Sequence, residues 1–204
     1  MKITRKGHGF TLMELLVVIS IIALLAALVI GSGSSGSARR NVTQSTKQAI
    51  EAALERYKIE HGEYPEPVNA DETTEIMPGQ VYRIGAARCL YQALRGDGND
   101  AIQGAGRAEK GEPQSDGRVS TDEIKNVFMA DMPETLWRKV GSSYILVDAF
   151  GHPFQYIKAD SDKQNTINSS YDLWSYAEDD KNVMAKSKET EVNASLGVKW
   201  IKNW

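Results

Sequence analysis

The sequence predicts an α+β protein, in which a long N-terminal helix packs on a small antiparallel β-sheet and a variable helix and loop insertion lies between them. Two observations favour this class. The first 38 residues hold only four charged side chains and lead into an amphipathic helical pattern, whereas strand-like runs lie between residues 143 and 176. A helix with one apolar face needs a sheet to cover that face, which gives an α+β layer.

The composition fits one globular domain with an apolar segment attached. The 204 residues carry 24 basic and 27 acidic side chains, for a formal net charge of −3. The soluble part has no block of Lys or Arg, so we expect no nucleic-acid partner, because phosphate binding needs clustered cations. The single cysteine, Cys89, excludes an intramolecular disulfide and a multi-cysteine zinc site.

The long helix begins with an apolar run. Residues 15–30 are apolar except for Ser20, and the stretch from residue 10 to residue 30 would span roughly 31 Å as a helix, about one bilayer core. We therefore expect one membrane crossing, with the short basic segment before it in the cytoplasm. A secretory signal peptide is the alternative. Its apolar region is usually about 7–15 residues long, and Glu14 at the start of this run is a costly group to place in lipid.

The residues around that glutamate carry a family resemblance. Residues 9–15, GFTLMEL, followed by the apolar run, resemble the class III signal of type IV pilins and type II secretion pseudopilins. The resemblance implies cleavage between Gly9 and Phe10 by a prepilin peptidase, N-methylation of Phe10, and retention of the apolar segment. It also implies that Glu14 meets the N-terminal amine of a neighbouring subunit, or its own, during filament assembly, so that a buried charge gains a partner.

The second half of the helix follows a glycine-rich break. Residues 31–38, GSGSSGSA, should be a weakened or locally melted segment, because each Gly costs about 0.5–1 kcal/mol relative to Ala in a helix. Beyond it, apolar residues recur at helical spacing on one face. They are Val42, Ala49, Ile50, Ala53, Leu54 and Tyr57. Gly62 is a suitable helix stop, and Pro65 follows it.

Residues 66–135 form the variable insertion, and their pattern is weaker. We expect a helix over residues 86–95 with Cys89 in the core, a surface loop over 96–120, and a short helix over 121–128. The acidic residues at 97–100 lack the spacing of an EF-hand, so a turn is favoured over a cation loop.

Three strand signals follow. Residues 143–147 and 153–158 predict a hairpin across the turn at 148–152, and residues 171–176 supply a third strand. Together with the terminal Trp-Ile-Lys-Asn-Trp, these segments resemble the C-terminal signature of the type II secretion major pseudopilin, the G family. The resemblance implies a pilin-like fold.

That family implies a calcium ion in the loop after the third strand. The candidate ligands kept in this sequence are Leu173, Ser175, Asp179 and Asp180. Val198 and Lys199 stand where the family has an acidic pair, in a loop lengthened to about 22 residues, so no cofactor is assigned and calcium is left open. The alternative is a loop held by the packing of Trp200 and Trp204, or by contacts with neighbouring subunits.

We expect no enzyme. His8, His61 and His152 are scattered, and the sequence shows no nucleophile triad, phosphate loop or metal-spaced His/Cys pattern. The tryptophans at 174, 200 and 204 fit core packing better than carbohydrate stacking.

The resulting hypothesis is a structural pseudopilus subunit of a type II secretion system. Its segments are a removable leader (1–9), a transmembrane and filament-core helix (10–30), the weakened segment (31–38) and a periplasmic domain (39–204) that ends in a C-terminal loop and tail (178–204). Expected partners are further copies of the chain, minor pseudopilins, prepilin peptidase, the inner-membrane secretion platform and membrane lipid before assembly. A type IV pilin for adhesion, motility or DNA uptake is the runner-up, and a single-pass anchored binding protein that never polymerises is the third possibility.

Overall fold

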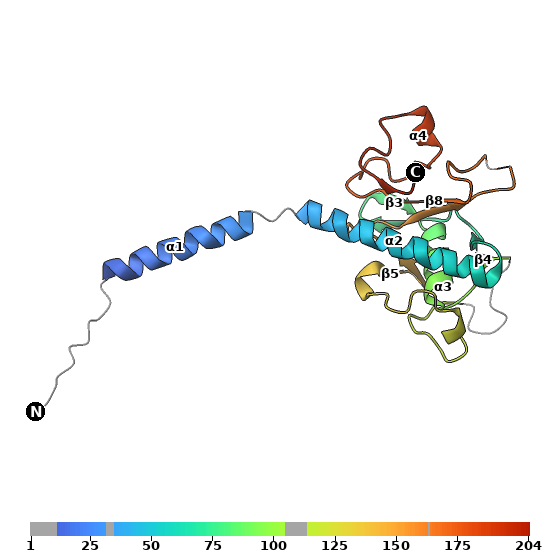
Figure 1. Ribbon diagram of the computed structural model, residues 1–204, viewed down its shortest axis with the longest axis horizontal. Coiled ribbons are helices and arrows are strands. Elements are labelled where there is room, and N and C mark those ends of the chain that lie inside the picture. The colour runs from blue at the N-terminus through green and yellow to red at the C-terminus, as the bar shows by residue number, and fades with distance from the viewer. Residues whose placement is uncertain (1–11, 32–34, 105–113, 163) are drawn as a thin grey trace, which may run out of the picture. The chain divides into compact units, whose positions relative to one another are not determined.

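The computed structural model describes residues 12–31, 35–104, 114–162 and 164–204 of the chain. Its internal contacts divide the chain into two compact units, Met1–Ser35 and Gly36–Trp204. The described part of the first unit consists chiefly of the helix α1 (Leu12–Gly31). The second unit holds the remaining secondary structure and is α+β, with small antiparallel sheets, as the sequence predicts (Figure 1).

The helices of the second unit are one long helix, one medium helix and several single turns. They are α2 (Ser35–His61), α3 (Gly85–Arg95), α4 (Glu189–Val192) and the 3-10 turns η1 (Ile124–Asn126) and η2 (Glu134–Leu136). α2 ends at the predicted stop, where Gly62 has a φ of +83° and its N–H donates to the carbonyl of Lys58 at 2.8 Å. Positive φ is the conformation that glycine adopts without strain, which explains the stop.

The helix expected over residues 121–128 is wrong, because only the turn η1 forms there. The N–H groups of Phe128 and Met129 both donate to the carbonyl of Leu94, at 2.9 and 2.8 Å. That carbonyl lies at the end of α3 and would otherwise have no partner in its own helix. The segment leaves helical geometry at Val127, which is extended, and its backbone completes the end of α3 instead.

The strands are short and all their pairings are antiparallel. They are β1 (Glu66–Pro67), β2 (Thr73–Met77), β3 (Gln80–Arg83), β4 (Ile102–Gln103), β5 (Trp137–Val140), β6 (Ser143–Leu146), β7 (Gln155–Lys158), β8 (Tyr171–Ser175) and β9 (Ile201–Lys202). They form three pairs, β1 with β4, β2 with β3 and β5 with β6, and one three-stranded sheet in the order β7-β8-β9.

The predicted hairpin between residues 143–147 and 153–158 is wrong in its pairing. β6 pairs with β5, and β7 pairs with β8, so that one isolated bridge from Val147 to Pro153 remains between the two predicted strands. The reason is local. Gly141, with a φ of +61°, permits a tight turn that folds β6 back on the preceding residues. Pro153 has no N–H to extend a ladder with β6.

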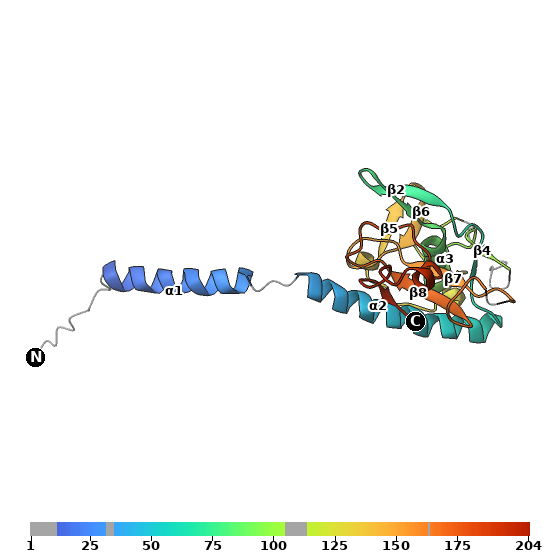
Figure 2. The same cartoon turned by 90° about the horizontal axis from the view of Figure 1, so that it is seen from above.

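α2 and α3 form the main core together with β6, β7 and β8. Ile50, Ala53 and Leu54 of α2 meet Leu90 and Leu94 of α3 in this core. β6, β7 and β8 add further buried side chains to the same cluster: Tyr144, Leu146, Tyr156, Tyr171 and Leu173. Figure 2 shows α2 along one side of this unit and the β2–β3 hairpin on the opposite side.

A second core cluster joins the β2–β3 hairpin to the C-terminal tail. It contains Tyr82, Trp174, Tyr176, Val183 and Trp200, with Trp204 packed at its edge. The rings of Trp174 and Trp200 stack with centroids 5.9 Å apart. The core-packing interpretation of these tryptophans is confirmed, and so is the buried position of Cys89.

Candidate functional site

α1 presents apolar side chains in every direction. Every side chain from Leu12 to Ile22 is exposed. The seven leucine, isoleucine and valine side chains between residues 15 and 22 of this helix are each about half exposed. The hydroxyl of Ser20 donates to the carbonyl of Leu16 at 2.8 Å, so the polar group is satisfied within the helix. Exposed apolar surface of this extent is typical of a helix that is covered by a protein or lipid partner.

Among the residues that the structure describes, no helix is both long and apolar enough to qualify as a membrane span. The transmembrane half of the predicted helix is therefore not confirmed by the structure.

The predicted processing and assembly residues lie at the start of this helix. Gly9 and Phe10 fall outside the described residues. Glu14 lies in the first turn of α1, and its side chain is exposed. A carboxylate in the first turn interacts favourably with the positive end of the helix dipole, worth about 0.3–1 kcal/mol at a surface.

The predicted calcium ligands lie in or just after β8. Ser175 is fully buried, and its hydroxyl donates to the carboxylate of Asp148 while accepting the N–H of Ala177 at 2.9 Å. Leu173 donates its N–H to the side-chain oxygen of Asn203 at 2.9 Å, which ties β8 to the C-terminal tail. These two residues thus take part in the packing of the strand itself.

The two aspartates of the loop also have partners within the protein. The indole N–H of Trp200 donates to Asp179 Oδ2 at 3.0 Å, and the amide of Asn182 lies 2.9 Å from both of its oxygens. Asp180 is exposed, and its Oδ1 lies 3.1 Å from Nε2 of His152. Across the described residues, no three His, Cys, Asp or Glu side chains converge as a metal ion would require.

The structure adds a buried group that the sequence reasoning did not assign. Asp148 is buried, and its Oδ1 accepts the N–H groups of Phe150 and His152 at 2.8 and 2.9 Å. Burial raises the pKa of Asp148 above its ordinary value, while these hydrogen bonds and the neighbouring His152 oppose the shift. The aspartate belonged to the family signature, so a signal was present, but its partner Ser175 is 27 residues away.

The loop expected over residues 96–120 contains a second buried carboxylate, which corrects the surface-loop prediction for its described part. Asp97 is 1% exposed. It accepts the hydroxyl proton of Tyr91 at 2.5 Å and the N–H groups of Asp116 and Gly117 at 3.0 and 2.9 Å. Burial raises its pKa, and the hydrogen bonds from Tyr91 and from the two backbone N–H groups oppose that rise. Asp97 therefore joins the beginning of this loop to residues near its end.

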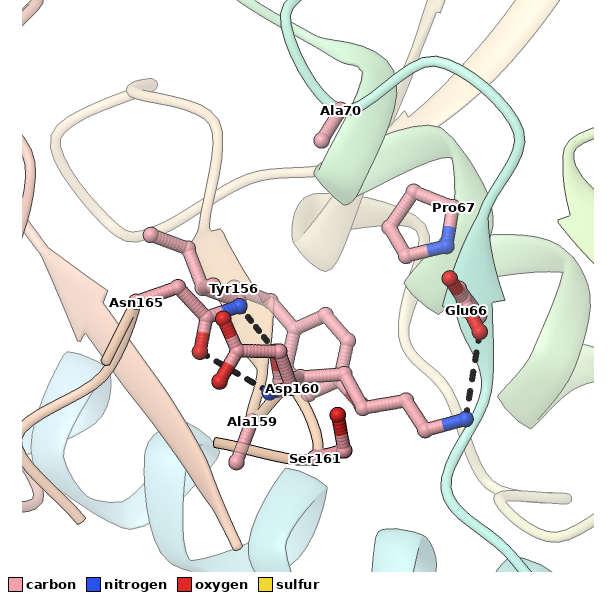
Figure 3. Close-up of a pocket in the computed structure, with 10 residues that line it drawn as sticks. Glu66, Pro67, Ala70, Tyr156, Ala159, Asp160, Ser161 and Asn165 are labelled. Carbon is pink, nitrogen blue, oxygen red and sulfur yellow. Dashed lines mark hydrogen bonds and ion pairs between the residues drawn. The ribbon is translucent and has the colours of Figure 1, made fainter. Parts of the chain in front are cut away.

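The pocket in Figure 3 has a volume of about 450 Å³ and lies between β1 and the segment after β7. Several of its polar groups form ion pairs or hydrogen bonds within the protein. Lys158 pairs with Glu63 at 2.5 Å and Glu66 at 3.2 Å, and Asn165 accepts the N–H of Asp160 and donates to the carbonyl of Lys158. The lining acts as a set of structural contacts between β7 and the chain after α2.

Comparison with known proteins places the similarity at the N-terminus. Residues 4–30 match the prokaryotic N-terminal methylation motif. The chain is 42% identical over 67 residues to type II secretion system core protein G of Escherichia coli (strain K12), which covers 32% of this chain and 46% of that protein. Proteins of the same name from Pseudomonas aeruginosa and Vibrio cholerae are 41% identical over 63 residues and 37% over 67, covering 44% and 46% of those proteins.

These findings confirm the resemblance to type IV pilin-like proteins and to the G family that the sequence predicts. The chain spans less than half the length of the curated relatives that it matches. No solved structure matches the chain significantly.

Proposed function

We propose that this chain is a structural, non-catalytic subunit of a type II secretion pseudopilus, which assembles into a short helical filament that drives protein export across the outer membrane. The observation that carries the proposal is the methylation motif over residues 4–30, joined to the similarity with core protein G over the N-terminal region. The exposed apolar surface of α1 supports it, because a filament core would cover that surface.

The precursor is held in the inner membrane by residues 10–30, with its N-terminus in the cytoplasm and residues 39–204 in the periplasm. The basic residues before the apolar run support this orientation through the positive-inside rule. Prepilin peptidase cuts between Gly9 and Phe10 and Phe10 is then methylated. The cut removes Lys2, Arg5 and Lys6, so the precursor loses its basic N-terminal segment when the new N-terminal amine forms.

During assembly the carboxylate of Glu14 pairs with the N-terminal amine of a neighbouring subunit. The first-turn position of Glu14 in α1, four residues after Phe10 in the sequence, supports this proposed pairing. Further partners are minor pseudopilins and the inner-membrane secretion platform, and a separate cytoplasmic ATPase supplies the energy.

A type IV pilin for adhesion, motility or DNA uptake is the second candidate. The specific observation in its favour is that the matched methylation motif is a general prokaryotic one and ends at residue 30. Gene neighbourhood separates the two functions: a secretion ATPase, a secretin and minor pseudopilins support the pseudopilus, whereas a retraction ATPase and pilus adhesins support the pilin.

Co-expression of the full chain with a prepilin peptidase tests the processing step. Intact mass spectrometry should show loss of residues 1–9 and one added methyl group on Phe10. Replacing Gly9 with Val should leave the precursor uncut, because the peptidase must place the residue before the scissile bond in a site that accepts glycine.

Gly7→Val is the matched control, since it puts the same side chain two residues earlier in the same leader. It should be processed normally. Normal cleavage of the Gly9 variant, or no cleavage of the wild-type chain, would remove the basis for this function.

A further inference from the structure

The loop between β8 and β9, residues 178–199, is where the family resemblance implies calcium. A calcium ion takes about 6–8 oxygen ligands and balances their negative charge. In this chain the oxygens of Ser175 and Asp179 already accept or donate hydrogen bonds within the protein. Other oxygens of the loop accept from donors on α2 and β3.

One arginine closes the loop at both of its ends. Nη1 of Arg40, on α2, lies 2.5 Å from Oε2 of Glu178 and donates to the carbonyl of Lys199 at 2.8 Å. Glu178 and Lys199 are the first and last residues of the loop. A single guanidinium nitrogen thus bridges a carboxylate and a carbonyl that lie 21 positions apart in the sequence.

A second arginine holds the middle of the loop. Arg83, on β3, is 7% exposed, and its Nη2 donates to the carbonyl of Ala185 at 3.1 Å and contacts the hydroxyl of Tyr176 at 3.4 Å. A buried cation is costly unless oxygens satisfy it, so the carbonyl and the guanidinium stabilise each other. Lys186, the next residue of the loop, pairs with Asp71 at 2.9 Å, and Asp71 lies 4.0 Å from Nε of Arg83.

The β2–β3 hairpin adds a neutral contact to these charged ones. The amide of Gln80 donates to the carbonyl of Asp180 at 2.5 Å. The loop is consequently tied to α2 by Arg40 and to β3 by Gln80 and Arg83. β3 and β8 also contribute side chains to the same core cluster, which contains Tyr82 and Trp174.

This donor set does not fit calcium. Carbonyl and carboxylate oxygens that could serve a metal ion accept instead from Arg40 and Arg83, whose fixed positive charges would repel a divalent cation. The two aspartates among the candidate calcium ligands have different partners. Oδ1 of the exposed Asp180 lies 3.1 Å from Nε2 of His152, whereas Asp179 accepts the indole N–H of Trp200.

We propose that Arg40 and Arg83 hold the C-terminal loop closed in the way that a bound metal ion would, so that the position of the loop does not depend on divalent cations. The proposal does not rest on the pseudopilus function, because it concerns the folding of residues 178–199 in the isolated chain.

Hydrogen exchange and thermal unfolding of the full chain in detergent micelles test it, with millimolar Ca²⁺ or with a chelator. The wild-type Tm and the exchange of residues 178–199 should be the same in both. Arg40→Gln should speed exchange of the loop amides by about threefold to tenfold, as expected for loss of a partly exposed charged contact. Arg83→Met should lower Tm by roughly 3–8 °C.

Arg39→Gln is the matched control, because Arg39 precedes Arg40 on α2 but lines the groove beside residues 134–138 and 147–151. It should leave loop exchange unchanged. Should Arg83→Met fail to fold, Arg83→Lys keeps the charge, and the Arg40 variant still carries the test. A rise in wild-type Tm with Ca²⁺, or loop exchange in Arg40→Gln equal to that of the wild type, would overturn the proposal.

Discussion

Asp97 and Asp148 show how single residues organise this fold. Each is a buried carboxylate whose oxygens accept two backbone N–H groups and one side-chain hydroxyl proton. Charged hydrogen bonds of this kind contribute more than neutral ones, but burial disfavours the ionised form. For both residues the burial effect is the larger, so the pKa is raised.

Asp97→Asn should destabilise the second unit by about 1–3 kcal/mol, because its amide NH2 would face one of the two backbone donors, the N–H of Asp116 or that of Gly117. The effect should also depend on pH. The pKa of Asp97 is raised above 3.8 in the folded state, so the folded protein holds its proton more tightly than the unfolded chain does. Stability conferred by the wild-type residue is thus greatest below pH 3.8 and falls as the pH rises through the folded pKa.

Urea unfolding of both proteins at several pH values checks this prediction. The difference in unfolding free energy between wild type and variant should shrink as the pH rises from below 3.8. A difference that grows over this range would mean that the hydrogen bonds outweigh burial at Asp97.

At the scale of elements, α3 is positioned by a glycine that has no room for a side chain. An ideal Cβ at Gly85 would lie 1.7 Å from the backbone oxygen of Asn69. The first turn of α3 therefore packs directly on the chain that precedes β2. This contact fixes α3, which packs in turn against β6 and β7.

Gly85→Ala should lower the free energy of unfolding by about 1–3 kcal/mol, since backbone must move to admit the methyl group. Gly36→Ala is the matched control, because Gly36 lies in α2 and an added Cβ there meets nothing within 4 Å. That change should be neutral or stabilising by up to about 1 kcal/mol. Denaturant unfolding measures both, and equal destabilisation by the two variants would contradict the close approach at Gly85.

Elements with long periodic patterns could be predicted from the sequence, and elements defined by distant partners could not. α2 and α3 combine a helical apolar face with a glycine stop, and both form as predicted. β8 is a buried aromatic-rich strand and also forms, at Tyr171–Ser175. The pairing of β6 depends on the turn at Gly141, whose signal was weaker than the longer turn at 148–152.

The same distinction between contiguous patterns and distant partners applies to the residues of the candidate site. The pattern around Glu14 is contiguous, so the sequence alone identifies it, and the match over residues 4–30 confirms the motif. The roles of Arg40 and Arg83 could not be predicted, because each contacts a loop more than 90 positions away in the chain. The sequence pattern around each arginine indicates only a polar side chain on a helix or on a strand.

At the scale of the whole molecule, the two units differ in what surrounds their apolar side chains. The second unit buries its apolar residues in its own core clusters. α1 leaves its described apolar side chains exposed, which is typical of a helix that is covered by a protein or lipid partner. The similarity to core protein G lies in the N-terminal region, which contains this helix. Under the proposed function, assembly should depend on a few residues of the first unit.

Glu14→Leu is the sharpest test of that dependence. Leucine removes a carboxylate that is costly in lipid, by about 2.5–3.5 kcal/mol near the bilayer centre and by less near the interface, where the apolar run begins, so the variant should insert and be cleaved at least as well as the wild type. Assembly should nevertheless fall by tenfold or more, because the neighbouring N-terminal amine would lose its partner, and an unpaired buried charge costs about 3–5 kcal/mol. Ser20→Leu is the matched control: it replaces the other polar side chain of α1, whose hydroxyl is already bonded to Leu16 within the helix. Filament yield after shearing, measured beside the processed fraction, separates assembly from maturation. If Glu14→Leu gave filaments at the yield of Ser20→Leu, the carboxylate would have no part in assembly, and packing of the apolar surface alone would have to drive it.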